Sequence, residues 1–401
     1  MPSPLAHERR VLAFDRLRGL AMVLMAVDHA MYVFCGEKVA ADSAYFGAIG
    51  QDLAPYGGPW HFLTRWITHL CAPVFLFLVG TSLAQSIDHR QRRGDSAGSI
   101  DVHLMSRGAM LIALEFWMSI AWGLLVIQVL WAIGASLVAF ALLRRLPWRL
   151  VGALGATWIV GQELVIDALG ITPAPAGPGS GGPTLLEALF LAPNFYAYPG
   201  FQVGAVALPG FAVVNYPVAG WLAIAMVGWA FGSWFVELQG RGVDAPRIAS
   251  RLLVRVGLAL LVVFALVRLA DGYGNFDLVR TDDSWLRWLQ VSKYPPSLAF
   301  VSLTLGVGAL LLGLLLRSDR PGRNGPLVVF GQTALFFYLV HIHAMEASRA
   351  LLALRYDVLA RENVFTQLST PLAAGWIGAV AALAVLYPAC RAWRARRRRA
   401  T

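Results

Sequence analysis

Apolar stretches of about 20 residues recur along this chain, separated by short segments rich in Gly, Pro or Arg. A helix needs about 20 apolar residues to cross a hydrocarbon core of about 30 Å, so each stretch predicts one transmembrane helix. The pattern predicts an all-α fold: a polytopic membrane helix bundle of about ten transmembrane helices, forming one domain over residues 1–401. The spans are predicted near residues 12–35, 66–87, 106–123, 125–143, 149–169, 211–236, 251–270, 295–316, 326–347 and 370–389.

The composition excludes a water-soluble protein. Hydrophobic residues make up 58% of the chain and charged residues 14%, against about 25% charged in soluble domains. The mean hydropathy is +0.61. The first apolar stretch is too long for a signal peptide, so we expect no cleaved leader.

The arginines set the predicted orientation. A net charge of +10 could indicate nucleic-acid binding, but the arginines cluster between apolar stretches, which is a topology signal. With both termini in the cytoplasm, every cytoplasmic segment is basic, and the outer segment 170–210 has no Lys or Arg. We therefore expect no nucleic-acid partner, and a basic tail at 392–401 that rests on membrane lipids. The excess of Arg over Lys suggests a bacterial inner membrane.

The outer segment between the fifth and sixth predicted spans has two parts. Residues 172–184 are rich in Pro and Gly, which predicts an exposed loop. Residues 185–210 are aromatic and apolar, and we expect them to form a re-entrant or interfacial cover.

The first predicted span carries five ionisable residues, and each is a functional candidate because such groups are costly inside a membrane. They are Asp15, Arg16, Arg18, Asp28 and His29. Arg18 and His29 are 11 positions apart, which places them on one helix face about 16 Å apart along the axis. Structural roles for both remain open, including a buried ion pair between Arg18 and Glu115.

Histidines gather near the predicted outer surface: His29, His61, His69, His341 and His343. Pro73 follows His69 at i+4, so we expect a kink there. His341 and His343 should point to opposite sides of their helix, so only one can face His29. Imidazole suits general-base catalysis because its pKa is near neutral. A metal site is the weaker interpretation because the spacing does not match known ligand motifs.

The three cysteines, Cys35, Cys71 and Cys390, show no metal-ligand spacing. A disulfide between Cys35 and Cys71 is an alternative to free buried thiols.

Two motifs carry a family resemblance. DRLRGLAMVLMAVDHA (15–30) followed by WITHLCAPVFLFLVGTSLAQS (66–86) resembles the catalytic domain of heparan-alpha-glucosaminide N-acetyltransferase and its bacterial relatives. The resemblance covers roughly residues 10–90, and FGQTALFFYLVHIH (330–343) is similar to the C-terminal part of bacterial members. His29 stands where the lysosomal enzyme has asparagine, and His61 corresponds by location to that enzyme's catalytic histidine. The Arg18-to-His29 spacing is also similar to a motif of acyltransferase family three.

The resemblance implies a membrane acyltransferase that moves an acyl group, by default acetyl, from cytosolic acyl-CoA to a sugar or glycan outside. In this interpretation Arg18, with Asp15 and Arg16, anchors the CoA phosphates. His29 is the base, helped by Asp28 or His61, with His69 and His341 as further candidates. Direct transfer and an acyl-histidine intermediate both remain open.

Two other classes remain. A secondary transporter could use intramembrane Asp, Arg and His residues, but the paired discontinuous helices typical of transporters are not evident. A non-catalytic scaffold leaves the histidines without a role. A homodimer is compatible with the sequence, which contains no signal that sets the oligomeric state.

Overall fold

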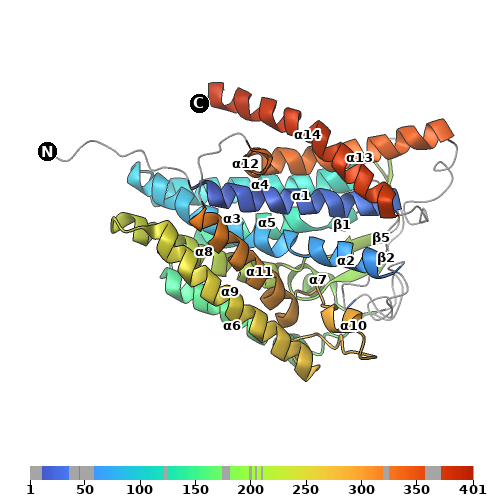
Figure 1. Cartoon of the computed structure of the whole chain (residues 1–401), viewed down its shortest axis with the longest axis horizontal. Coiled ribbons are helices and arrows are strands. Elements are labelled where there is room, and N and C mark those ends of the chain that lie inside the picture. The colour runs from blue at the N-terminus through green and yellow to red at the C-terminus, as the bar shows by residue number, and fades with distance from the viewer. Residues whose placement is uncertain are drawn as a thin grey trace.

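A computed structural model describes residues 11–35, 45, 58–121, 125–173, 181–197, 201–203, 206–208, 211–318, 325–356 and 372–400. It confirms an all-α membrane helix bundle (Figure 1). In these ranges seven helical segments are long and apolar enough to span a membrane. They are α1 (Leu12–Cys35), α2–α3 (Pro59–Arg92), α6 (Trp148–Ala168), α8 (Val218–Gly240), α9 (Ala245–Ala270), α11 (Leu298–Arg317) and α14 (Leu372–Ala400).

Other helices complete the bundle. A bent pair, α12 (Pro326–Gln332) and α13 (Ala334–Tyr356), becomes an eighth span if counted as one. α4 (Ala97–Ala121) and the 15-residue α5 (Val129–Leu143) pack against each other. The predicted count of ten spans therefore stays a prediction. α1 begins and α14 ends at the same end of the bundle (Figure 1). Whether that end is cytoplasmic is likewise still a prediction.

Two predicted spans are interrupted. The span predicted at 66–87 begins earlier, as α2 (Pro59–Thr68), and breaks before α3 (Cys71–Arg92). The break falls at His69. It was predicted there because Pro73 has no amide hydrogen to donate to the carbonyl oxygen of His69. The span predicted at 326–347 bends by 98° near Thr333 instead of crossing straight.

The segment predicted to form a cover contains strands that the hydropathy pattern did not predict. α7 (Leu185–Phe190) begins with a capping box formed by Thr184 and Glu187. β1 (Leu125–Ile127) pairs in parallel with β5 (Phe211–Val214), and β2 (Asn194–Ala197) pairs antiparallel with β5. β3 (Phe201–Val203) and β4 (Val206–Leu208) form a hairpin. The span predicted at 211–236 is therefore wrong at its start: residues 211–217 are not helical, and α8 begins only at Val218.

α1 runs through the middle of the bundle, while the strands, α2, α7 and α10 (Trp285–Leu289) gather at one end (Figure 1). Near its start α1 packs backbone against backbone with α12. A Cβ atom on Gly19 would lie 1.9 Å from the carbonyl oxygen of Leu327, and one on Gly331 would lie 1.9 Å from that of Asp15. Glycine at both positions allows this close crossing, and α1 also contacts α2 and α13.

Candidate active site

Two histidines far apart in the sequence meet between α1 and α13. Nδ1 of His29 lies 2.8 Å from Nε2 of His341, and the two rings stack with centroids 5.0 Å apart. His341 is completely buried, whereas His29 is only half-buried. Among the described residues, Nε2 of His29 has no hydrogen-bond partner. One imidazole is thus fixed in the protein interior, and the other keeps part of its surface exposed.

Backbone carbonyls determine which nitrogens carry protons in the neutral pair. Nδ1 of His341 lies 3.0 Å from the carbonyl oxygen of Phe337 and 2.7 Å from that of Tyr338. A carbonyl oxygen can only accept, so Nδ1 of His341 carries the hydrogen and its Nε2 is an acceptor. Nδ1 of His29 then donates to that acceptor, which leaves the lone pair of His29 on Nε2. The arrangement prepares His29 Nε2 to act as a base.

Asp28 lies beside the pair but does not orient it. Its carboxylate forms an ion pair with Arg65 of α2, and the Thr68 hydroxyl donates to it at 2.6 Å. Arg65 is 6% exposed, so this ion pair lies inside the protein. A buried guanidinium needs such a partner, because a lone charge there would be strongly destabilising. Asp28 thus holds Arg65 next to His29.

Lys293 completes the cluster, although it is not among the site residues predicted from the sequence. It is one of only two lysines in the chain and lies in the segment before α11. The residue is 5% exposed, with its ammonium 4.9 Å from the ring centroid of Tyr294. Lys293 interacts electrostatically with both Asp28 and His29. A lone lysine at the outer edge of an apolar stretch was the available signal.

The other candidate histidines lie elsewhere. His61 is half-buried near the start of α2, and buried His69 contacts the Phe300 ring edge-on at 5.6 Å. In the described part of the chain, the hydrogen-bonding partner of His29 is His341, not either of these. His343 stacks on Trp117 of α4 at 5.3 Å, so it points away from His341, as its spacing predicts.

The candidate CoA-anchoring residues lie near the start of α1 in a polar network. Arg18 donates to Asp15 at 3.2 Å and also to the hydroxyl of Ser82 and the carbonyl of Gly331. Asp15 in turn accepts from Gln332 at 2.9 Å, and Arg16 is half-buried. The contacts of Arg18 involve α3 and α12, whereas His29 contacts α13. A common tunnel joining Arg18 to His29 is therefore a prediction that these contacts do not test.

Two alternatives from the sequence are wrong. Glu115 does not pair with Arg18, because its carboxylate accepts from the backbone N–H of Trp131 at 3.0 Å at the start of α5. Cys35 and Cys71 do not form a disulfide, since both thiols are free. Among the described residues, no group of three or more His, Cys, Asp or Glu side chains is placed to hold a metal ion.

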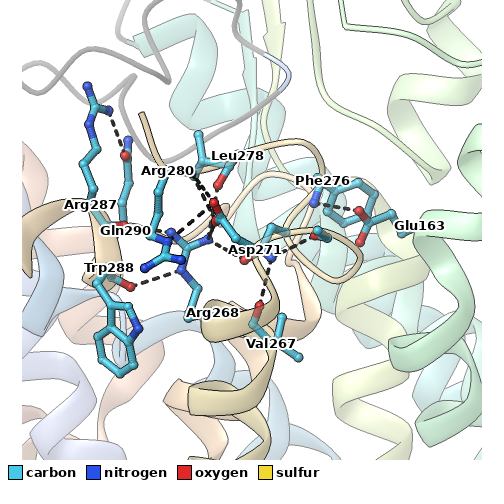
Figure 2. Close-up of polar contacts among 12 residues, drawn as sticks. Glu163, Val267, Arg268, Asp271, Phe276, Leu278, Arg280, Arg287, Trp288 and Gln290 are labelled. Atoms are coloured by element: carbon cyan, nitrogen blue, oxygen red, sulfur yellow. Dashed lines mark hydrogen bonds and ion pairs between the residues drawn. The ribbon is translucent and has the colours of Figure 1, made fainter. Parts of the chain in front are cut away.

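Buried Arg268, near the end of α9, organises the segment that leads to Lys293 (Figure 2). Its guanidinium donates to the carbonyl oxygens of Trp288 at 3.1 Å and Arg287 at 2.7 Å. It also donates to Asn275 Oδ1 at 2.6 Å and to the carbonyl of Leu278 at 3.1 Å. These four hydrogen bonds connect the segment between α9 and α11 to the end of α9.

Glu163 of α6 anchors the same loop from the other side (Figure 2). Its two carboxylate oxygens accept from the backbone N–H groups of Gly274 at 2.6 Å and Phe276 at 2.9 Å. The residue is only 6% exposed, so these hydrogen bonds lie inside the protein. Together Glu163 and Arg268 fix the loop between α9 and α11, from which Lys293 reaches the histidine pair.

Comparison with known families identifies the chain. Compared with curated proteins, it shows no significant match. Residues 10–269 match the family model described as heparan-alpha-glucosaminide N-acetyltransferase, catalytic. The match contains Asp28, His29 and Arg65, while Lys293 and His341 follow it in the sequence and are brought to the same site by the fold. Because the match covers more than half of the 401 residues, this chain belongs to the heparan-alpha-glucosaminide N-acetyltransferase catalytic-domain family of membrane acetyltransferases.

Proposed function

We propose that the protein transfers an acetyl group from cytosolic acetyl-CoA to an amine or hydroxyl group of a sugar on the extracytoplasmic side. The family match supports acetyl transfer. The observation that carries the proposal is the His29–His341 pair, with one imidazole nitrogen directed away from its partner. Acetyl transfer from a thioester needs a base at this point, because a protonated amine or a neutral hydroxyl is a poor nucleophile.

In the proposed reaction, Nε2 of His29 removes a proton from the acceptor as its nitrogen or oxygen attacks the thioester carbonyl. The new C–N or C–O bond forms, the C–S bond breaks, and the proton held by His29 returns to the departing CoA sulfur. Hydrogen bonds run from His29 to His341 and from His341 to the carbonyl oxygen of Phe337. They keep His29 in the tautomer whose Nε2 can accept a proton. An acyl-histidine intermediate would use the same nitrogen as a nucleophile, so both routes remain compatible with this geometry.

Positive charge near the pair would stabilise the transition state. The oxyanion formed at the acetyl carbonyl develops close to His29, where Lys293 and Arg65 supply fixed cationic groups. Since Asp28 neutralises Arg65 directly, Lys293 is the cation left to face the developing charge.

Sided proteoliposomes test this function. With acetyl-CoA outside and an amino sugar enclosed in vesicles that contain inside-out protein, we expect free CoA outside and acetylated sugar inside. The measurements are thiol release and mass spectrometry of the enclosed sugar. CoA release without any acetylated acceptor, or solute flux without CoA release, would contradict the proposal, and the second result would favour a transporter.

Replacing Lys293 by methionine is expected to lower kcat about 10²-fold, because the oxyanion loses a preorganised cation. The KM for acetyl-CoA should change little, because the CoA phosphates are proposed to bind near the opposite end of α1. Steady-state kinetics on the purified protein measure both constants, and Lys293→Arg, which keeps the charge, should restore part of the rate. A raised KM with an unchanged kcat would argue for a binding role instead.

A further inference from the structure

A basic cavity lies on a part of the bundle remote from the histidine pair. It has a volume of about 360 Å³ and lies between α9 and α11. Its lining consists of Arg247, Ser250, Arg251, Val254, Arg255 and Arg317. We call it the arginine cavity. The buried Ser250 hydroxyl donates to the carbonyl of Gly313 at 2.7 Å, which ties the two helices together at its base.

The four arginines of the cavity lack acidic partners. Elsewhere Arg144 and Arg145 share Asp101, and Arg65 pairs with Asp28. In the described ranges, by contrast, no carboxylate forms an ion pair with Arg247, Arg251, Arg255 or Arg317. Four like charges around one cavity repel one another unless an anion lies between them. The cavity therefore has the charge of an anion site without an internal counterion.

The surroundings of the cavity are apolar. α9 is largely uncovered by protein, with 22% of its most apolar window buried. Besides the arginines, the exposed side chains of α9 include Leu252, Val256, Leu258 and Val262. In a membrane this surface faces hydrocarbon, so a ligand at the arginine cavity contacts both charge and lipid.

The direction of α9 places the charges at one leaflet. Its first turn lies toward the same end of the bundle as the start of α1 and the end of α14 (Figure 1). Helical side chains tilt toward the helix N-terminus, so Arg251 and Arg255 reach back toward that end. In the predicted topology this is the cytoplasmic side, where the phosphates of the inner leaflet lie.

We propose that the arginine cavity binds the phosphate headgroup of an anionic phospholipid in the inner leaflet, with its acyl chains along the apolar side of α9. Arginine matches phosphate oxygens with two parallel N–H donors, which suits this ligand. The bound phosphate would join α9 to α11 through Arg317. The proposal rests on the predicted topology but not on acetyl transfer, so it can be tested without an activity assay.

The test is the thermal unfolding of detergent-purified full-length protein titrated with dioleoylphosphatidylglycerol or dioleoylphosphatidylcholine. We expect the anionic lipid to raise Tm and the zwitterionic lipid to have little effect. The variant Arg251→Gln/Arg255→Gln should need about 25-fold more anionic lipid for the half-maximal shift, since each arginine contributes about fivefold. The matched control Arg92→Gln/Arg93→Gln removes the same charge from exposed positions at the end of α3, away from both the cavity and the tail, and should behave like the unmodified protein.

Three results would overturn the proposal. The first is an equal loss of the lipid effect in both double variants, which would indicate a general charge effect. The second is an unchanged response of Arg251→Gln/Arg255→Gln. The third is stabilisation by free coenzyme A or inorganic phosphate through the same arginines without a response to phosphatidylglycerol, which would assign the cavity to a water-soluble phosphate. If the double variant does not purify as a single species, Arg317→Gln provides the same test from α11.

Discussion

Replacing His29 by alanine should lower kcat for acetyl transfer by about 10²–10⁴-fold, the usual contribution of a positioned general base. The physical reason is that Nε2 of His29 is the nitrogen of the pair that the tautomer arrangement leaves unprotonated and directed away from His341. The measurement is CoA release from acetyl-CoA by the purified protein in the presence of an acceptor. A rate within threefold of the unmodified protein would remove His29 from the mechanism.

His341→Ala separates the two roles within the pair. We expect a smaller loss of about 10²-fold, because His29 keeps its basic nitrogen but loses the acceptor that fixes its tautomer. The double variant should lose little more than His29→Ala alone, since residues that act as a unit are non-additive. His343→Ala is the matched control: it changes a histidine of the same helix that stacks on Trp117 instead of His29. A comparable loss in His343→Ala would show that these effects are structural.

The second large effect is expected for Arg268→Met, which should lower the free energy of unfolding by about 3–5 kcal/mol. The substitution leaves the acceptors of Trp288, Arg287, Asn275 and Leu278 without their donor in the protein interior. Unfolding in detergent measures the loss of stability. Limited proteolysis between residues 271 and 290 should show faster cleavage, because the same bonds hold this loop.

Arg280→Met is the control for this experiment. Arg280 lies in the same loop, but its side chain is 24% exposed and its ion pair with Asp271 spans 3.5 Å. Partly exposed ion pairs contribute about 0–1 kcal/mol, so this variant should remain close to the unmodified protein. Equal destabilisation by both substitutions would mean that the buried hydrogen bonds of Arg268 have no special role.

The residues near the two ends of α1 differ in how far the sequence could predict them. The ionisable side chains of the first span were recognisable because any such group inside an apolar stretch is costly and therefore has a partner or a function. For Arg18 the partners turned out to be Asp15, Ser82 and Gly331, whereas the sequence suggested Glu115. A helical face can be read from spacing, but the identity of the helix packed against it cannot.

The sequence alone determined that this is a membrane helix bundle, because the length of an apolar stretch is fixed by the thickness of the bilayer. It also determined the break near His69, since Pro73 removes a backbone donor whatever the surroundings. The strands at one end of the bundle were not determined in this way, because β1 and β5 pair across more than 80 residues. The site was decided by tertiary structure for the same reason: His29 and His341 are 312 residues apart, and Lys293 comes from a third segment, in a loop that Arg268 and Glu163 hold. Local spacing encodes helices and bends, whereas contacts between distant segments depend on how the helices pack.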